Sequence, residues 1–298
     1  MHSGKLALGT VQFGMRYGIA NRRGQLDLAE ARKVLERAAA AGIDTLDTAM
    51  TYGTSEATLG SLGVEQWRVI SKLPALPDPC PDVEGWVRSA LESCLERLRL
   101  GRLGALLLHA PADLAGPKGA ALYAALLAMK RDGLVERIGI SIYDPRELAA
   151  LDGLRFDVVQ APFNPIDRRL AASGWLYTLR RAGVEIHVRS IFLQGLLLMR
   201  ADDRPASFAR WQPVWNLWHG WLAKNGLSAL EACLGYVAGY PQIDRVVVGV
   251  DGLAQLDDIL NARIAPLSEL PLALSVDDLD LINPSRWPRL PGARMQRQ

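Results

Sequence analysis

Residues 27–49 read DLAEARKVLERAAAAGIDTLDTA, and this stretch decides the fold. Asp27 is a helix-capping residue that precedes the helical pattern Leu28–Ala41, and Gly42 follows as a stop signal. A short β-type run, Thr45–Asp47, comes directly after it. The stretch therefore predicts a helix that ends at a glycine and leads into a strand.

The same unit recurs along the chain. Helix-like spacing is also found in Pro81–Leu98, Gly119–Asp132 and Ser228–Gly239. The β-type runs are Leu6–Gly9, Thr45–Asp47, Arg68–Ser71, Ala105–His109, Ile138–Ser141, Val158–Pro162, Glu185–Ser190 and Arg245–Val248. Eight strand-helix units over about 250 residues predict an α/β protein, a (β/α)8 TIM barrel closed by a parallel sheet. We expect a single domain over residues 1–298.

An open, doubly wound sheet is the alternative on pattern alone. Such a sheet usually holds a dinucleotide on a glycine-rich loop after a strand, and the sequence contains no G-x-G-x-x-G. The connection at residues 193–226 is longer than an ordinary strand-to-helix loop. The tail from residue 283 is rich in Pro and Arg, and we expect it to be loosely ordered.

Composition excludes several classes of function. The 298 residues carry a formal charge of +2 with dispersed basic residues, so nothing indicates a nucleic-acid partner. The apolar runs are too short to cross a membrane, and the N-terminus does not have the pattern of a secretory signal. Cys80, Cys94 and Cys233 lie far apart without metal-ligand spacing, so we expect no metal site and a reducing, cytoplasmic location.

Polar residues follow three successive strands. Asp47 and Tyr52 come after the second strand, Lys72 after the third and His109 after the fourth. In a parallel barrel these strand ends meet at one rim, where active sites lie. A lysine or aspartate there is commonly only a solvated charge, and a histidine after an apolar strand is commonly structural. Four such groups on three neighbouring strands make a catalytic role the better interpretation.

This group has a clear chemical interpretation. Tyrosine titrates near ~10, and a neighbouring ammonium such as that of Lys72 would lower that pKa. Asp47 would hold Lys72 in place. Tyr52 would then give a proton to a carbonyl oxygen that His109 orients by a hydrogen bond. No side chain supplies a hydride, so a nicotinamide cofactor is implied.

At this point the sequence resembles the aldo-keto reductase family. The matching blocks span most of the chain: Leu8-Gly9-Thr10-Val11-Gln12-Phe13-Gly14, Gly42-Ile43-Asp44-Thr45-Leu46-Asp47-Thr48-Ala49 with Tyr52-Gly53, Ser55-Glu56-Ala57-Thr58-Leu59-Gly60, Ser71-Lys72, Leu107-Leu108-His109-Ala110-Pro111, Gly139-Ile140-Ser141, and Gln160 with Asn164. The resemblance implies Asp47, Tyr52, Lys72 and His109 as the catalytic tetrad. It also implies that Ser141 and Gln160 bind the nicotinamide carboxamide, and that Gly9 and Thr10 contact the cofactor.

The sequence departs from the family pattern at three places. Ile142 stands where the family usually has Asn after the strand-5 serine. Arg189 stands where an aromatic residue often stacks on the nicotinamide, and a guanidinium can also stack there or reach a phosphate. After strand 8 the family usually has a cationic or serine side chain for the 2′-phosphate of NADP. Here Asp251 stands in that loop and can accept a hydrogen bond from a free ribose hydroxyl.

The cofactor is therefore NADPH or NADH, and we expect NADH to serve at least as well. Further contacts are expected from the loops after strands 7 and 8, namely from Arg189, Ser190, Phe192, Gln194, Gly195, Gly249, Asp251 and Gln255.

The sequence predicts an NAD(P)H-dependent oxidoreductase that reduces a small carbonyl substrate, which is an aldehyde, a ketone or a sugar derivative. Two alternatives stay open. One is a barrel that uses its nicotinamide for epimerisation or elimination, and the other is a non-catalytic binding module. Trp211, Trp215, Trp218 and Trp221 either form a wall over the substrate or pack the apolar face of a helix.

Overall fold

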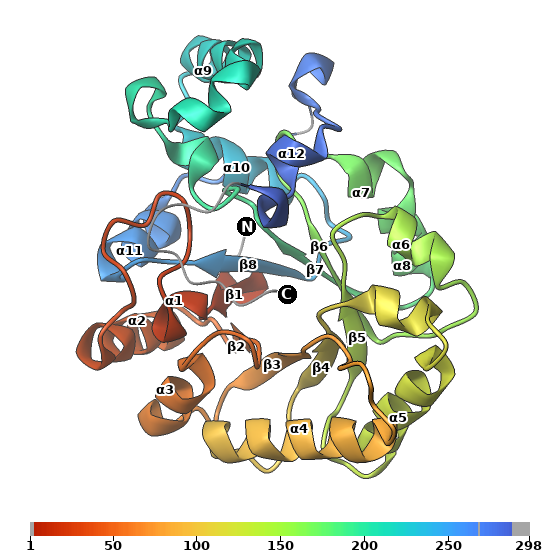
Figure 1. The fold of residues 1–298 in the computed structure, drawn as a ribbon. Coiled ribbons are helices and arrows are strands. Elements are labelled where there is room, and N and C mark those ends of the chain that lie inside the picture. The colour runs from red at the N-terminus through yellow and green to blue at the C-terminus, as the bar shows by residue number, and fades with distance from the viewer. Residues whose placement is uncertain (1–2, 268, 288–298) are drawn as a thin grey trace.

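The computed structural model describes residues 3–267 and 269–287 of the chain. Eight parallel strands close into a barrel in sequence order, with helices around them (Figure 1). The strands are β1 (Leu6–Gly9), β2 (Thr45–Asp47), β3 (Arg68–Leu73), β4 (Ala105–Leu108), β5 (Ile138–Ser141), β6 (Val158–Pro162), β7 (Glu185–Arg189) and β8 (Arg245–Gly249). The predicted (β/α)8 TIM barrel is confirmed.

The barrel closes between its first and last strands. β1 pairs with β8 in the register Leu6↔Val246 to Gly9↔Gly249, and β1 also pairs with β2. Each of the eight predicted strands is present. The strand ends differ from the predicted ones by at most two residues, the largest difference being at β3, which continues to Leu73.

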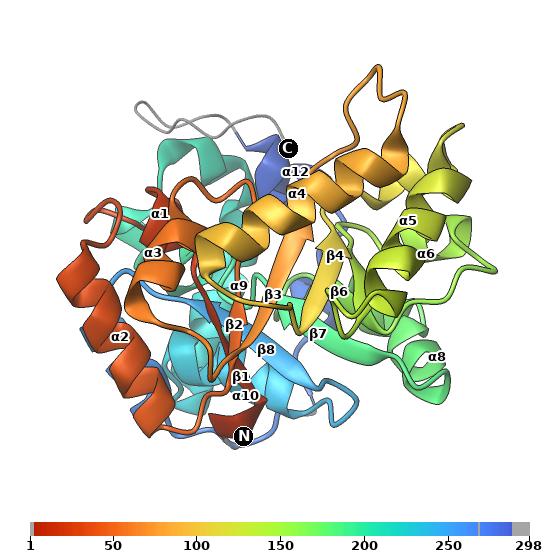
Figure 2. The same ribbon diagram turned by 90° about the horizontal axis from the view of Figure 1, so that it is seen from below.

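Most of the helices lie outside the barrel, whereas the short α1 (Val11–Gly14) is buried at its C-terminal rim. The other helices are α2 (Leu28–Ala40), α3 (Ser55–Leu62), α4 (Val83–Leu98), α5 (Gly119–Arg131), α6 (Arg146–Ala150), α7 (Arg169–Ala172), α8 (Trp175–Arg181), α9 (Gln212–Asn225), α10 (Ala229–Ala238), α11 (Leu253–Asn261) and α12 (Leu279–Ile282). In Figure 2, α2 and α4 lie on the outside of the barrel. Their apolar faces bury residues such as Val34 and Leu91 against the strands, and this packing is the main source of helix stability.

The helix starts follow from side-chain caps. The Asp27 carboxylate accepts a hydrogen bond from the backbone N–H of Glu30 and begins α2, as predicted. Asp82 begins α4 in the same way, and Ser228 with Glu231 forms a capping box at α10. Gly42 follows α2 with φ of 80°, a backbone conformation that suits glycine. These local signals fix where the helices α2, α4 and α10 begin and where α2 ends.

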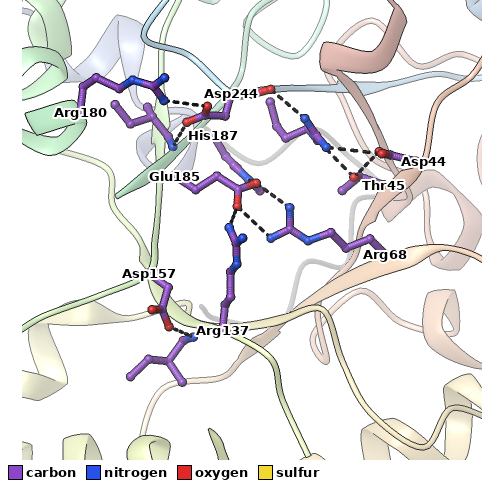
Figure 3. Close-up of polar contacts among 12 residues, drawn as sticks. Asp44, Thr45, Arg68, Arg137, Asp157, Arg180, Glu185, His187 and Asp244 are labelled. Carbon is purple, nitrogen blue, oxygen red and sulfur yellow. Dashed lines mark hydrogen bonds and ion pairs between the residues drawn. The ribbon is translucent and has the colours of Figure 1, made fainter. Parts of the chain in front are cut away.

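A network of charged side chains fills the N-terminal end of the barrel (Figure 3). The Glu185 carboxylate accepts hydrogen bonds from Arg68 at 2.6 and 3.0 Å and also pairs with Arg137. Its Oε1 lies 2.8 Å from Nε2 of His187, which is fully buried. Burial lowers the pKa of His187 to about 3, so this imidazole is neutral. The network joins β3 and β7 at the end of the barrel that serves stability in this fold.

The connection from β7 to α10 contains its own structure. It holds the 3₁₀ turns η3 (Leu196–Leu198), η4 (Ala201–Asp203) and η5 (Ala206–Trp211), followed by α9. Trp215 and Trp218 of α9 are fully buried in a second hydrophobic cluster outside the barrel. Their indole N–H groups donate to the carbonyls of Phe208 and Leu197 at 3.0 and 3.1 Å.

The remaining 3₁₀ turns are η1 (Ser3–Lys5), η2 (Pro111–Ala115), η6 (Leu272–Leu274) and η7 (Pro284–Arg286). The tail expected to be loosely ordered begins at residue 283. Residues 283–287 form η7 and its flanks, where the Trp287 indole donates to the Leu281 carbonyl at 3.0 Å. The rest of that tail, residues 288–298, lies outside the described residues.

Candidate active site

The site is built on a buried ion pair between β2 and β3. Nζ of Lys72 lies 2.6 Å from Oδ1 of Asp47 and also donates to the backbone carbonyl of Thr48 at 2.8 Å. Both side chains are buried, Lys72 completely. Burial lowers the pKa of Lys72, while the Asp47 carboxylate opposes that shift. The pair is a fixed, nearly neutral unit beneath the C-terminal rim of the barrel.

A close glycine contact holds the turn that carries Tyr52. The Thr54 N–H donates to the Gly14 carbonyl at 3.2 Å, so the end of α1 lies against this turn. A Cβ added at Gly14 would lie 1.9 Å from the Tyr52 carbonyl oxygen. Gly53 has φ of 55°, and a Cβ there would lie 2.4 Å from the Gly14 oxygen. Only glycines allow the two backbones to approach this closely.

Hydroxyl groups tie the same turn to the barrel. The Ser55 hydroxyl donates to the Thr10 carbonyl at 2.8 Å and lies 3.1 Å from the Thr48 hydroxyl. The Thr10 hydroxyl donates to the Asp47 carbonyl at 3.0 Å. All of these groups are buried. The chain segments that carry Asp47 and Tyr52 are therefore positioned by the end of β1.

Tyr52 stands over the ion pair, and its phenol stays protonated. The Lys72 Nζ lies 5.3 Å from the Tyr52 ring centroid. Burial raises the pKa of Tyr52 above its ordinary value, the Asp47 carboxylate adds to that shift, and Arg189 opposes it. The sequence predicted that Lys72 lowers this pKa, but the net shift is upward, because burial of the phenol is the largest effect on it.

His109 faces Tyr52 edge to face. The ring centroids are 6.0 Å apart at an interplanar angle of 77°. Burial lowers the pKa of His109 to about 3, with help from Lys72 and Arg189, so the ring is neutral at physiological pH. The Thr51 hydroxyl lies 3.4 Å from Nδ1. When it donates there, the ring proton is on Nε2 and can be given to a substrate oxygen as a hydrogen bond.

Two residues assigned to the cofactor, Ser141 and Gln160, are bonded to other residues of the site. The Gln160 amide donates to Oδ2 of Asp47 at 2.7 Å, and its carbonyl accepts from the Ser141 hydroxyl at 3.1 Å. Both side chains are fully buried. Arg189 stands next to Ser141, with Nε 3.4 Å from its hydroxyl. Gln160 therefore also orients the carboxylate of the ion pair.

A cavity of about 430 Å³ opens above this group. Most of the predicted site residues line it, namely Asp47, Tyr52, His109, Gly9, Thr10, Arg189, Ser190, Phe192, Gln194, Gly195, Gly249, Asp251 and Gln255. Lys72, Ser141 and Gln160 lie behind its wall. Tyr17 lines the cavity, whereas no tryptophan of the segment 211–221 does.

The loop after β7 has a strained backbone. Ser190, Leu193 and Gln194 have φ of 58°, 49° and 53°, which side chains other than glycine adopt at a cost. Gln194 donates from its amide to the Tyr17 hydroxyl at 3.1 Å and accepts from the Ala20 N–H at 3.4 Å. The loops after β1 and β7 thus meet over the cavity. Backbone strain in a loop that lies over a cavity is typical of a ligand-binding loop.

The loop after β8 closes the cavity from another side. Oδ1 of Asp251 accepts hydrogen bonds from the amides of Asn21 and Gln12 at 3.0 and 3.4 Å, and Oδ2 accepts from Gln255 at 3.4 Å. Burial raises the pKa of Asp251. Oε1 of Gln12 is buried and has no hydrogen-bond partner within residues 3–267 and 269–287, although Gln12 lines the cavity. A bound molecule with a donor group would satisfy this oxygen.

Several cavity residues were not assigned from the sequence, and Gln12, Asn21 and Tyr143 are among them. Gln12 belongs to the Leu8–Gly14 block, but it was not assigned a contact. Asn21 and Tyr143 lie in loops, where no periodic pattern shows the direction of a side chain.

In the described part of the chain, no cluster of three or more His, Cys, Asp or Glu side chains is suited to a metal ion. Within those same residues, no helix combines the length and apolar character needed to cross a membrane.

Comparison with known proteins gives a family. A model of the aldo/keto reductase family matches residues 5–273, which is most of the chain. No curated protein matches the sequence.

Solved structures share the fold at low sequence identity. The aldo-keto reductase AKR11C1 from Bacillus halodurans, in its holo form, superposes with a TM-score of 0.70 at 19% identity, covering 89% of this chain and 88% of its own. The glycerol dehydrogenase AKR11B4 from Gluconobacter oxydans gives 0.66 at 18% identity, with the same coverage of 89% and 88%. A Pseudomonas aeruginosa protein described as an aldo-keto reductase gives 0.63 at 24%, covering 86% and 88%.

Proposed function

The chain belongs to the aldo/keto reductase family, and from this premise we propose that it reduces a small aldehyde, ketone or sugar derivative to the alcohol, with Tyr52 as the proton donor. As a member of the family it is an NAD(P)-dependent oxidoreductase. The observation that carries the proposal is the protonated Tyr52 phenol, held over the Lys72–Asp47 pair and beside the neutral His109, on the wall of one cavity.

The residues of the cavity fit a nicotinamide dinucleotide. Backbone glycines of β1 and β8 lie at its floor, and Gln12, Gln194 and Gln255 bring amide groups to its walls. The unpartnered Oε1 of Gln12 is an acceptor that such a ligand can use. Gly9, Gly249 and the loop after β7 would hold the cofactor, which when bound supplies the hydride that the chain itself lacks.

The protein side chains supply the proton for the reduction. Tyr52 gives its phenolic proton to the carbonyl oxygen as negative charge develops there. His109 donates a hydrogen bond to the same oxygen and so fixes its orientation. The Lys72 ammonium, held by Asp47, lies 5.3 Å from the ring of the phenolate that forms and stabilises its charge. The surrounding burial keeps water from competing with these contacts.

The direct test is consumption of reduced cofactor. NADH and NADPH are each mixed with the protein and a panel of aldehydes, ketones and open-chain sugars, and the alcohol formed is identified. We expect one mole of alcohol for each mole of cofactor oxidised. Conversion of substrate with no net oxidation of the cofactor would instead identify an epimerase or a lyase. Binding of the cofactor with no conversion would identify a binding module.

We also propose that NADH serves at least as well as NADPH. The residues around the β8 loop are acidic: Asp251 lines the cavity, and Glu30 accepts a hydrogen bond at 3.0 Å from the N–H of Leu253, the first residue of α11. Glu30 thus already accepts a hydrogen bond from one backbone N–H at the N-terminus of α11, which is a position where a phosphate could otherwise bind. Two cations pair with Glu30, Lys33 at 3.8 Å and Arg23 at 4.0 Å, and both are largely exposed. A 2′-phosphate would meet carboxylates here, whereas a hydroxyl can donate to them.

Steady-state kinetics with both cofactors test this preference. Asp251→Ser should raise kcat/KM for NADPH relative to NADH, because a carboxylate that repels phosphate is removed. Arg23→Gln is the matched variant, and it should lower kcat/KM for NADPH if that arginine serves a phosphate. A native preference for NADPH of about a hundredfold or more, unchanged in Asp251→Ser, would contradict the proposal.

A further inference from the structure

Arg189 places a positive charge on the wall of the cavity. It is the last residue of β7, it is half-buried, and it lines the same cavity as Tyr52 and His109. Its charge acts on both of these side chains, since it opposes the rise in the pKa of Tyr52 and adds to the lowering of the pKa of His109. A small molecule bound against Tyr52 therefore lies within the field of this guanidinium.

The hydrogen bonds that Arg189 makes within the described residues go only to neutral groups. Nη2 donates to the Ile142 carbonyl at 3.0 Å, Nη1 to the Ser190 hydroxyl at 3.3 Å, and Nε to the Ser141 hydroxyl at 3.4 Å. A guanidinium has five N–H groups. Three are used in these contacts, so two are left for a ligand.

No carboxylate of residues 3–267 or 269–287 lies within 4.0 Å of the Arg189 guanidinium, in contrast to Arg169 at the start of α7. Arg169 is paired with Asp167 at 2.8 Å and with Asp144 at 3.0 Å. Of the other ionisable groups near Tyr52, Lys72 is paired with Asp47 and His109 is neutral. A half-buried charge without a counter-ion is costly, and an anion bound beside it offsets that cost.

The guanidinium is also held in a fixed position. Its Cζ lies 4.3 Å from the centroid of the Tyr143 ring, in a cation–π contact. Its three hydrogen bonds go to acceptors at the ends of two strands, β5 and β7. A fixed guanidinium loses little conformational entropy when it binds a carboxylate, and its planar fork matches the carboxylate oxygens. Arg189 thus has the features of a preorganised anion-binding group rather than those of a solvated surface arginine.

We infer that the carbonyl substrate carries a carboxylate or another anionic group, and that Arg189 binds that group while Tyr52 meets the carbonyl. This inference rests on the proposed reductase function and adds the class of substrate. Arg189 is thereby a specificity-determining residue. It contributes little to the chemistry of the carbonyl itself, which belongs to Tyr52 and His109.

Turnover of matched substrates tests the inference. The substrates are succinic semialdehyde and the ortho, meta and para isomers of carboxybenzaldehyde, each compared with its methyl ester, which has the same carbonyl but no charge. We expect kcat/KM for at least one carboxylate to exceed that of its ester by about 10- to 100-fold, the effect of a charge-assisted hydrogen bond.

Variants assign this preference to Arg189. Arg189→Met should remove the preference, by raising KM for the carboxylate far more than KM for the ester. Arg189→Lys should retain part of it, since the charge remains. The matched control is Arg210→Met. Arg210 also stacks on an aromatic ring, at 4.0 Å from Trp211, but it is exposed and outside the cavity, so its loss should leave the preference unchanged.

A binding measurement keeps the inference testable without turnover. The NADH-loaded protein is titrated with benzoate and with benzamide in a calorimeter. Benzoate should bind at least about tenfold more tightly than benzamide, and Arg189→Met should abolish the difference.

Two results would overturn the inference and leave the reductase function standing. One is equal turnover of carboxylates and esters together with equal binding of benzoate and benzamide. The other is a loss of NADH affinity in Arg189→Met with the carboxylate preference unchanged, which would assign the guanidinium to the cofactor. Absence of any carbonyl reduction would instead refute the proposed function, and the benzoate titration would then still decide whether Arg189 binds anions.

Discussion

At the scale of single residues, the site depends on charges that are buried and paired. Lys72 is fully buried, yet it sits in the barrel because Asp47 takes its charge at 2.6 Å and the Thr48 carbonyl accepts a second hydrogen bond. Gln160 holds the other oxygen of Asp47. Each member therefore depends on the next, and the nearly neutral unit holds the Lys72 ammonium 5.3 Å from the centroid of the Tyr52 ring.

We predict that Lys72 and Asp47 act on the rate as one unit. Lys72→Met leaves the Asp47 carboxylate unpaired below Tyr52, which further raises the Tyr52 pKa and slows proton transfer. Asp47→Asn leaves Lys72 buried without its counter-ion, which we expect to cost about 3–5 kcal/mol of stability. In a double-mutant cycle on kcat, the double variant should be little worse than the poorer single variant. Strictly additive losses in activation free energy would show that the two residues act separately.

The sequence identified these residues because each follows an apolar strand and ends at one rim. It did not show how they would share charge. The predicted lowering of the Tyr52 pKa was wrong because the pattern gives no measure of burial, and burial is the largest effect on that phenol. Ser141 and Gln160 were assigned to the cofactor by resemblance, and the sequence could not show that Gln160 also contacts Asp47 and Ser141 also contacts Arg189.

At the scale of elements, the position of Tyr52 depends on the contact between α1 and the turn after β2. Because Gly14 and Gly53 lack side chains, the two backbones touch, and the Thr54 N–H reaches the Gly14 carbonyl. The element that begins at the end of β1 thus supports both the floor of the cavity and the proton donor.

Gly14→Ala should therefore harm activity more than most helix substitutions. The added methyl would lie 1.9 Å from the Tyr52 carbonyl, so the Tyr52 turn must move and kcat should fall by about 10²-fold, as expected for a displacement near 1 Å. Gly220→Ala is the matched control, since Gly220 lies in α9 and a Cβ there meets nothing within 4 Å. That substitution should be neutral or stabilise by about 0.5–1 kcal/mol. Equal kcat in both variants would contradict this role of Gly14.

The elements themselves were predictable from sequence, and their ends less so. The predicted third strand stopped at Ser71, and Lys72 was placed directly after it. In the structure β3 continues through Lys72 to Leu73, which pairs with Leu108, since Asp47 neutralises the lysine. Loop residues such as Asn21 and Tyr143 were missed because loops lack a periodic pattern.

At the scale of the whole molecule, the two ends of the barrel have different roles. The C-terminal rim carries the cavity and its titratable groups. The N-terminal end is filled by Glu185, its arginines and the neutral His187 (Figure 3). Because this charged network lies at the opposite end of the barrel from the cavity, substitutions in it should affect stability rather than turnover.

The buried histidines make stability fall in acid. His187 and His109 have their pKa lowered to about 3 in the folded state, whereas the unfolded chain binds their protons below about 6.5. Between these values the unfolded state holds more protons, so this contribution to stability is full above about pH 6.5 and is lost as the pH falls. His187→Gln should reduce the slope by about 1.4 kcal/mol per pH unit. Urea unfolding from about pH 7.5 to 5 measures it, and equal slopes would show that His187 is not neutral when folded.

The most direct test of the catalytic account is the removal of one hydroxyl group. Tyr52→Phe keeps the ring that packs beside His109, so the protein should fold and bind NADH with native affinity, as measured by cofactor fluorescence. Turnover of the best carbonyl substrate should fall by about 10²–10⁴-fold because no group replaces the phenolic proton. Turnover within a few fold of the native protein, at unchanged NADH affinity, would show that Tyr52 is not the proton donor.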